Sequence, residues 1–421
     1  MKLDGHGYSA TILHRILHMA GVVSSFDVAA VALAVVGEIQ ISDREINKLV
    51  VEVGGQLQAD RDARTAAYVN QDLPRPSTEV TPPVDLAGVF CDGGRMRTRD
   101  EGQGTGVHRP HWREPKNAAF HRMQSGTFAQ DPQPDLPACF RNQAYVEKLV
   151  KGLKGYKKEG REEALEETSS PTEVAEPLPG RCEWQPKTLF RTCLSSLATS
   201  DDFGPMMAAE ADARGFFAAQ KKAFLGDGLP YNWTIQQRWF PRFEPIVDFL
   251  HAVEYLYTCA KAVHAVPTAY WQQYVDWATA CWQGRVDQVL IELNAWQARV
   301  GSVPEGEELS ESDPRKVIQT TRTYLTNNCA RMDYPRYRQT GLPVTSSLAE
   351  SLVKQIHQRV KGTEKFWNDG ASGEAILQIR AAIISEDERL ATWLRTRPIS
   401  PFSPRCRSAT LTSSITLAVS P

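Results

Sequence analysis

The sequence predicts a mixed α/β protein with an all-helical insertion, preceded by a small helical N-terminal domain. Short apolar runs that end in aspartate and glycine, such as those over 84–94 and 222–228, predict buried strands, and helical patterns alternate with them. Between 261 and 330 the apolar spacing is helical only, and 1–70 is helical up to a proline-rich break. These observations favour a mixed sheet covered by helices.

Composition places the chain among ordinary soluble globular proteins. Hydrophobic residues make up 42% and charged residues 23% of its 421 residues, which is enough chain for a sizeable core. The formal net charge is −2, from 48 Lys and Arg against 50 Asp and Glu. Any surface that binds nucleic acid must therefore come from a local cluster of basic side chains.

The cysteines and the apolar runs indicate the compartment. The eight cysteines are scattered without a C-x-x-C pair, which argues against a zinc ribbon and against a disulfide framework. The most apolar early run, around 28–36, is far shorter than a membrane span and lacks the flanks of a signal peptide. We therefore expect a cytoplasmic protein without membrane insertion.

The N-terminal domain, 1–70, is expected to contain two helices joined by a tight turn. Ser25 lies near the start of the first helix, and Ser42 with Glu45 has capping-box spacing at the start of the second. The second helix has one apolar stripe, formed by Ile46, Leu49, Val50 and Val53. Such a pair occurs in helix-turn-helix readers of DNA and, more commonly, in helical hairpins that pack on a larger domain.

The first part of the α/β core is expected over 82–260, with a boundary near Pro82. The strand that ends at Asp92 and the next two strand candidates, RMRTRDE and KNAAFHRMQSGTF, predict a three-stranded antiparallel meander. The charged stretch 157–180 has few large apolar residues and predicts a flexible excursion. Two further strand candidates, KAFLGDG and FEPIVDFL, precede a helix over HAVEYLYTCAKAV.

The remainder of the chain is expected to be mostly helical. The insertion over 261–330 is rich in tryptophan and is predicted to pack on itself; its tryptophans include Trp271, Trp277, Trp282 and Trp296. The C-terminal helices of the core are expected over 331–397. The tail over 398–421, dominated by Ser, Thr and Pro, is expected to be disordered.

Three acidic residues stand where a metal-dependent nuclease needs them. Asp92 and Asp227 each end a predicted strand, and Glu350 lies in the first turn of a predicted helix. Phosphodiester chemistry uses two divalent cations a few ångströms apart, and carboxylate oxygens suit Mg²⁺ or Mn²⁺. Each residue also has a plain structural explanation, because Asp-Gly is a common turn signal and Glu350 has capping-box spacing from Ser347.

Three blocks of sequence surround these residues and run in the same order from about His6 to Arg405. The first contains D-G-G-R, a basic strand and an H-x-x-H-W-[RK]-E turn, here Asp92, Gly93, Gly94, Arg95, His108, His111, Trp112, Arg113 and Glu114. The second contains Asp227, Asn232 and Trp233, then a D-x-x-H signature at Asp248 and His251. The third contains Glu350, a basic helix and Trp367. Together they resemble the catalytic blocks of the ISKra-type family of insertion-sequence transposases.

The resemblance implies an RNase H-like core with a helical insertion between Asp227 and Glu350. It also implies a DDE-type DNA transposase, a metal-dependent polynucleotidyl transferase in which Asp92, Asp227 and Glu350 hold two Mg²⁺ (or Mn²⁺) ions. Such an enzyme cuts the ends of an insertion sequence and joins them to target DNA, so it is nucleoid-associated when bound to DNA and acts at least as a homodimer. Related chains carry an upstream Cys-rich segment that this sequence lacks, which predicts a truncated chain.

Basic and histidine side chains near the three acidic residues are candidates for DNA contacts. Arg95 follows the first strand, while His108 and His111 lie in a Gly-rich loop, where a turn-stabilising role is equally open. Beyond Glu350, the lysines are expected on a different helix face from the apolar stripe of Leu348, Leu352, Ile356 and Val360. These lysines are Lys354, Lys361 and Lys365, and the alternative is a solvated polar face.

Asp248 and His251 are expected to support the site. His251 either orients Asp248 or a phosphate, or is a histidine of the core. Two other functions stay open: a catalytically inactive or truncated remnant that only binds DNA, and a hydrolase that uses paired carboxylates as acid and base. The second of these would need no metal.

Overall fold

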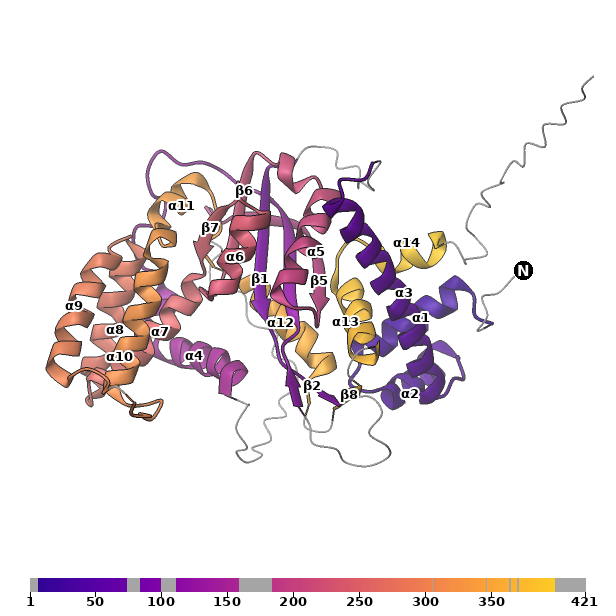
Figure 1. Cartoon of the computed structure of the whole chain (residues 1–421), viewed down its shortest axis with the longest axis horizontal. Helices are drawn as coiled ribbons and strands as arrows, with labels where there is room; N and C mark the ends of the chain where they lie inside the picture. Colours follow the sequence, from indigo (N-terminus) through magenta and orange to yellow (C-terminus); the bar gives the residue numbers. More distant parts are fainter. Residues whose placement is uncertain are drawn as a thin grey trace, which may run out of the picture.

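The computed structural model describes residues 7–73, 84–99, 111–158, 184–304, 306–345, 347–362, 365–368 and 371–397. It confirms a mixed α/β protein, with a five-stranded sheet surrounded by helices (Figure 1). The N-terminal helices and the helices of the predicted insertion lie on opposite sides of this sheet (Figure 1). No helix within these ranges is both long enough and apolar enough to cross a membrane.

The central sheet combines antiparallel and parallel strands. Its order is β5-β4-β1-β6-β7. β4 is antiparallel to both β1 and β5, whereas β6 is parallel to both β1 and β7. The strands span Leu86–Gly93 (β1), Lys116–Gln124 (β4), Lys187–Ser196 (β5), Lys221–Gly226 (β6) and Glu244–Val247 (β7). The carboxyl ends of β1, β6 and β7 therefore meet at one edge of the sheet.

The predicted meander is wrong in its second member, whereas its third member, KNAAFHRMQSGTF, is confirmed as a strand, β4, that is antiparallel to β1. The strand from RMRTRDE, β2 (Met96–Arg99), lies in a separate three-stranded sheet with β3 (His111–Arg113) and β8 (Trp367–Asn368). β4 pairs directly with β1, and the third antiparallel strand is β5, which sequence reasoning missed. β5 begins with exposed and half-buried residues, so its apolar pattern is weak at the start. Along its whole length, β5 pairs with β4.

The helices cover both faces of the sheet. α12 packs against β1 and β4, and α13 packs against β5, while α5 contacts β4 and α6 contacts β6. Outside the N-terminal part and the predicted insertion, the helices span Gln143–Lys158 (α4), Ser200–Ala213 (α5), Pro230–Trp239 (α6), Phe249–Val263 (α7), Ser347–Val360 (α12), Ala371–Ile384 (α13) and Arg389–Thr396 (α14). Short 3-10 turns occur at Ala138–Arg141, Phe216–Ala218 and Cys329–Arg331. The predicted C-terminal helices are thus present, and the tail 398–421 lies outside the described residues.

The N-terminal part contains three helices, α1 (Ala10–Val22), α2 (Phe26–Gly37) and α3 (Asp43–Val69), where two were predicted. Ser25 and Ser42 cap α2 and α3 as expected, each accepting a hydrogen bond from a backbone N–H three residues on. The apolar stripe of α3 is buried. These helices share one hydrophobic core with α13, which favours packing on the larger domain as the use of this stripe.

A close approach of α3 to α13 makes a matched pair of glycines informative. A Cβ at Gly54 would lie 2.5 Å from the carbonyl oxygen of Ala375, whereas a Cβ at neighbouring Gly55 meets nothing within 4 Å. We expect Gly54→Ala to lower the free energy of unfolding by about 1–3 kcal/mol through overpacking. Gly55→Ala should raise it by up to about 1 kcal/mol, because alanine favours a helix. Denaturant titration measures both, and a stabilising Gly54→Ala would contradict this packing.

The predicted insertion is helical, with α8 (Pro267–Trp282), α9 (Val286–Val300) and α10 (Pro314–Asn328), followed by α11 (Tyr334–Thr340). It does not pack only on itself. The ring of Trp282 lies 4.8 Å from that of Phe249 at the start of α7, and the guanidinium of Arg338 stacks on it at 4.1 Å. Trp282 also donates a hydrogen bond to the carbonyl of Gln133. The insertion is therefore joined to the core through this tryptophan.

α4 extends into the start of the predicted flexible excursion, up to Lys158. Most of that excursion, 159–180, lies outside the described residues. α4 itself was not predicted. Its apolar side that includes Val146 and Val150 is buried, and the helix packs against α7.

Candidate functional site

A row of polar residues crosses the central sheet at the carboxyl end of β1. Asp92 of β1 pairs with Asn117 of β4, which in turn pairs with Ser195 of β5. On the other side of β1, the last register pairs are Cys91 with Gly226 and Gly226 with Val247. The residues that follow those pairs, Asp92, Asp227 and Asp248, therefore stand side by side at the ends of three neighbouring parallel strands. Adjacent strands are about 5 Å apart.

The local sequence explains why Asp92 occupies this place. The six residues from Leu86 to Cys91 are buried, and Asp92 is the first half-buried residue of β1. Its Oδ1 accepts a hydrogen bond of 2.7 Å from the backbone N–H of Gly93. The apolar run thus positions the strand, and its end brings a carboxylate to the edge of the core.

Asp227 is held in the tight turn between β6 and α6. Its Oδ1 accepts hydrogen bonds from the backbone N–H of Leu229, at 2.9 Å, and from the side-chain amide of Asn232, at 2.8 Å. Gly228 has a φ of 97°, a conformation that suits glycine. Asp227 is therefore a turn aspartate, as its structural explanation proposed, and it also stands beside Asp92.

Asn232 adds a buried acceptor to this corner. Its side chain is fully buried, and while its amide nitrogen binds Asp227, its Oδ1 has no hydrogen-bond partner. Buried carbonyl oxygens are normally satisfied, so this oxygen beside a carboxylate is an exception that needs an explanation. Gly226 leaves room for this side chain, because a Cβ there would come within 3.0–3.2 Å of it.

The electrostatic field around Asp92 and Asp227 is negative. Burial raises the pKa of Cys91 and of Tyr231 well above their ordinary values, and the charges of Asp92 and Asp227 raise both further. Lys116 is a positive charge near this corner. Its Nζ lies 4.3 Å from the ring of Tyr231 and 2.8 Å from Glu114. Two neighbouring carboxylates disfavour further negative charge near them and favour the binding of cations.

Asp248 follows the end of β7, the strand next to β6, and His251 lies in the first turn of α7. Asp248 is fully buried and caps α7, accepting from the N–H of Leu250 at 3.1 Å. His251 lies between two carboxylates, with Nε2 3.8 Å from Asp248 Oδ2 and Nδ1 3.9 Å from Glu254 Oε2. Burial alone lowers the pKa of His251, but Glu254 and the aspartates, Asp248 foremost, raise it to about 10. His251 is a core histidine whose protonated form is favoured by the neighbouring carboxylates.

Glu350 lies in the first turn of α12, the helix that packs on β1 and β4. Its side chain lies outside the described part of the structure. Two turns further on, His357 accepts a hydrogen bond from the backbone N–H of Arg95 at 3.0 Å, just beyond the end of β1. Because seven residues are nearly two helical turns, position 350 is on the same side of α12 as His357. Among described residues, no group of three or more His, Cys, Asp or Glu could hold a metal ion.

The structure disperses the other candidate DNA contacts. Arg95 follows the glycines after Asp92 and is half-buried; His108 and the side chain of His111 lie outside the described residues. Lys354 is exposed on α12. The prediction for Lys361 and Lys365 is wrong in one respect, because α12 ends at Val360 and both lysines follow it. At the end of the helix, Trp367 Nε1 donates to the Val360 carbonyl at 2.9 Å, and β8 begins at Trp367.

The predicted apolar stripe of α12 is confirmed where it is described. Leu352, Ile356 and Val360 are buried, and Leu348 falls outside the described side chains. Burial lowers the pKa of Lys365, and the charge of Arg359 lowers it further. The Nζ of Lys365 donates to the carbonyl of Gln358 at 3.2 Å, so the side chain of Lys365 lies against the last turn of α12.

His357 gives a pH dependence with a definite sign. Burial, and then the charge of Lys361, lowers its pKa to about 3, far below the ordinary 6.5. Below pH 6.5, the His357 side chain therefore binds a proton in the unfolded chain, whereas in the folded chain it stays neutral until the pH is near 3. The stability present above that pH should fall on acidification, by up to about 1.4 kcal/mol per pH unit. Denaturant titrations from neutral to mildly acidic pH should show a shallower fall for His357→Gln than for the wild type, and parallel curves would contradict this assignment.

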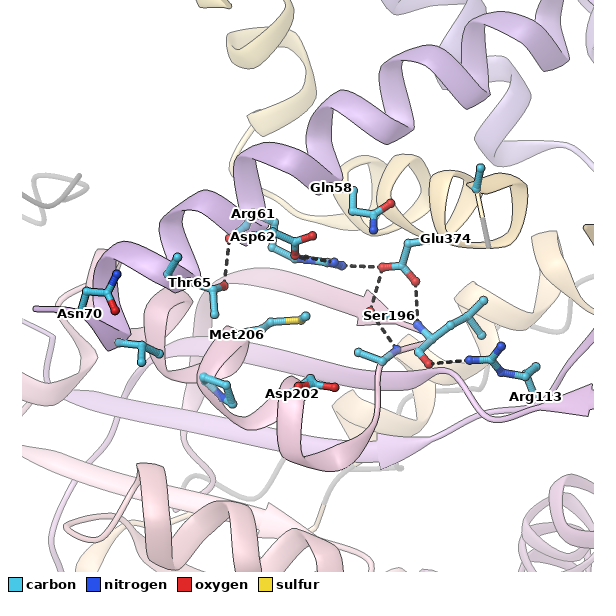
Figure 2. Close-up of a pocket in the computed structure, with 16 residues that line it drawn as sticks. Gln58, Arg61, Asp62, Thr65, Asn70, Arg113, Ser196, Asp202, Met206 and Glu374 are labelled. Carbon is cyan, nitrogen blue, oxygen red and sulfur yellow. Dashed lines mark hydrogen bonds and ion pairs between the residues drawn. The ribbon is translucent and has the colours of Figure 1, made fainter. Parts of the chain in front are cut away.

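A cavity of about 840 Å³ lies beside the polar row, at the carboxyl end of β5 between α3, α5 and α13 (Figure 2). Its wall contains Arg61 of α3 and Glu374 of α13, whose Nη1 and Oε1 are 2.5 Å apart. Glu374 also accepts from the hydroxyl of Ser196 at 2.8 Å and from the N–H of Leu197 at 2.7 Å. Arg61 and Glu374 neutralise each other, and their contacts connect α3 to α13 and to the end of β5. Neither Asp92 nor Asp227 lines the cavity, so we assign its wall a structural role.

Sequence reasoning missed the polar residues that extend the row across the sheet. Ser195 donates to Asn117 Oδ1 at 2.7 Å, and both side chains are buried. The signal was an asparagine at the start of the apolar run KNAAF, where a buried strand normally has none. Comparison with known protein families and with curated proteins gives no significant match to this chain.

Proposed function

We propose that the chain is a DDE-type DNA transposase, which cleaves DNA at the ends of an insertion sequence and joins the new ends to a target. The observation that carries the proposal is the position of Asp92 and Asp227 at adjacent carboxyl ends of β1 and β6. The sheet supports it, because three antiparallel strands followed by two strands parallel to the first are what an RNase H-like core requires. The family resemblance of the surrounding sequence points the same way.

The donor set fits a hard divalent cation. Asp92 and Asp227 are half-buried carboxylates on neighbouring strands, and Asn232 adds an unsatisfied oxygen beside them. Such oxygens suit Mg²⁺ or Mn²⁺, with Glu350 as the expected third carboxylate. When bound, two such ions would lower the pKa of the attacking water or 3′-hydroxyl and stabilise the leaving oxygen.

The protein's own task is then positioning. Leu229 and Asn232 orient the carboxylate of Asp227 by two hydrogen bonds, and Tyr324 donates to its backbone carbonyl at 3.0 Å. The protonated form of His251, which Glu254 and Asp248 favour, would offset part of the negative charge of the aspartates. Holding carboxylates in fixed geometry is the larger part of catalysis in phosphoryl transfer, because little covalent help is needed.

A nicking assay tests this proposal. A supercoiled plasmid that carries the DNA flanking the gene should be nicked by the purified chain in Mg²⁺ or Mn²⁺, and not in EDTA. A gel shift on the same DNA in Ca²⁺ should show a complex. Cleavage that is insensitive to EDTA, or no DNA binding at low salt, would overturn the proposal.

A second candidate is a remnant that binds DNA without cutting it. Among the three expected carboxylates, the described side chains are those of Asp92 and Asp227, and the side chain of Glu350 lies outside them. The same experiment separates the two functions, because a remnant forms the complex and leaves the plasmid supercoiled under every metal condition.

A further inference from the structure

The turn after β6 is held by one helix of the predicted insertion. The hydroxyl of Tyr324 donates to the backbone carbonyl of Asp227 at 3.0 Å. The side-chain amide of Asn328 donates to the backbone carbonyl of Gly228 at 3.3 Å. Tyr324 and Asn328 are four residues apart in α10, so they lie on the same face of that helix. α10 therefore contacts two consecutive carbonyl groups of the turn that carries Asp227.

The core fixes these two side chains in turn. The ring of Tyr324 stacks on that of Tyr255 in α7, with ring centres 3.9 Å apart and ring planes at 13°. Asn328 is buried, and its Oδ1 accepts a hydrogen bond from the indole N–H of Trp233 in α6 at 2.9 Å. Its amide nitrogen also donates to the carbonyl of Tyr324 at 2.9 Å. A buried network of this kind makes the local structure rigid, so the turn has a fixed partner in α10.

The close contact between the turn and α10 requires glycine at position 228. Gly228 has a φ of 97°, and a Cβ there would lie 2.5 Å from Cε2 of Tyr324. A larger residue would strain the backbone and displace the tyrosine ring. The turn and the helix therefore fit each other closely, although Asp227 and Tyr324 are 97 residues apart in sequence.

The contacts from α10 complete the set that holds Asp227. Leu229 and Asn232 donate to its Oδ1 at 2.9 and 2.8 Å, so they orient the carboxylate. Tyr324 and Asn328 hold the backbone from which that carboxylate extends. Groups that orient a metal ligand commonly change metal affinity by about 10- to 100-fold when they are removed. The contacts from α10 are therefore of a kind that can set how tightly this corner binds a cation.

We propose that Tyr324 and Asn328, which we call the α10 clamp, position Asp227 for the binding of a divalent cation. This inference rests on the proposed function, and it gives the predicted helical insertion a task at the site. The two residues are positioning residues, because they contact the backbone of the turn. A clamp that only stabilised the fold would leave the affinity for the cation unchanged.

Isothermal titration calorimetry with Mn²⁺ on the full chain without DNA measures metal binding separately from activity. Tyr324→Phe keeps the ring and removes the hydroxyl, so it should weaken Mn²⁺ binding about tenfold. Tyr274→Phe is the matched control, because Tyr274 is buried in α8 of the same insertion and donates to the carbonyl of Phe140 at 3.1 Å. It should lower the melting temperature in EDTA as much as Tyr324→Phe does, and bind Mn²⁺ like the wild type.

The nicking assay gives a second measurement. For Tyr324→Phe, the Mn²⁺ concentration at half-maximal nicking should rise about tenfold, while the rate at saturating Mn²⁺ stays within a few-fold of the wild type. Asn328→Ala should raise this concentration as well, and if its melting is not cooperative, Tyr324→Phe decides the question alone. Equal Mn²⁺ affinity in Tyr324→Phe and Tyr274→Phe would overturn the clamp.

The failures of the two proposals can be told apart. A wild type that binds Mn²⁺ and nicks DNA, with no effect of Tyr324→Phe on either, overturns the clamp alone. Mn²⁺ binding that depends on Tyr324 without metal-dependent nicking supports the clamp and overturns the catalytic proposal. A wild type that binds no Mn²⁺ overturns both.

Discussion

Asp92→Asn is expected to abolish Mg²⁺-dependent nicking, by roughly three orders of magnitude or more, while the chain still binds DNA. Asparagine keeps the size of the side chain and can still accept from the N–H of Gly93. It removes the negative charge that would hold a cation beside Asp227. Nicking kinetics and anisotropy on the same preparation measure both effects.

The fold should survive this change, which separates a catalytic role from a structural one. Asp92→Asn removes one of two neighbouring negative charges, so the free energy of unfolding in EDTA should stay the same or rise. Asp276→Asn is the control for the chemistry of the substitution, because Asp276 is exposed on α8 and accepts a hydrogen bond from Gln272. Equal loss of DNA binding and of nicking in Asp92→Asn would count against the catalytic assignment.

Glu210→Ala is expected to have the largest effect on stability. Glu210 of α5 is only 4% exposed, and its Oε1 lies 2.7 Å from Arg389 and 2.9 Å from Arg214. Arg64 of α3 is 3.6 Å from its other oxygen. Removing the carboxylate leaves Arg214 and Arg389 to share one remaining carboxylate, Asp387, at 2.6 Å and 3.1 Å. Breaking this buried cluster costs up to about 3–5 kcal/mol. Denaturant titration should show this loss.

The pKa of Glu210 supports the same conclusion and predicts an acid dependence. Burial alone raises its pKa, but Arg389, Arg214 and Arg64 outweigh burial and hold the pKa well below the ordinary 4.5. Its contribution to stability is therefore present above that pH and is lost as the pH falls below it.

An exposed ion pair supplies the control for Glu210. Glu311 and Lys316 are 2.8 Å apart, with side chains 75% and 36% exposed. Because water screens such a pair, Glu311→Ala should change the free energy of unfolding by less than about 1 kcal/mol. If both variants lose a similar free energy of unfolding, the buried cluster contributes no more to stability than an exposed ion pair does.

The strand-end aspartates show what local sequence can predict. Asp92 and Asp227 follow buried apolar runs, and both stand at strand ends in the structure. Ser42 caps α3 as its spacing with Glu45 predicted. These features depend on residues within a few positions of one another, so the sequence carries them directly.

The errors concern contacts between distant segments. β2 has the alternation of a strand, but the pairing of β4 with β1 excludes it from the central sheet. β5 becomes a strand because it pairs with β4 along nine residues of register, Lys116 to Gln124. Lys361 and Lys365 leave the helix pattern because β8, which pairs with β2, begins soon after them. None of these partners is near in sequence.

The sequence by itself determined the mixed α/β class, the helix caps, the helical character of 261–330 and the two aspartates that end strands. Only the tertiary structure decided that Asp92 and Asp227 are neighbours, that Asn232 offers them an unsatisfied oxygen, and that Tyr324 contacts the turn of Asp227. The physical reason is the range of the interactions. Caps and apolar periodicity act within a few residues, whereas strand register and side-chain stacking depend on which distant segments lower the free energy most when they pack together.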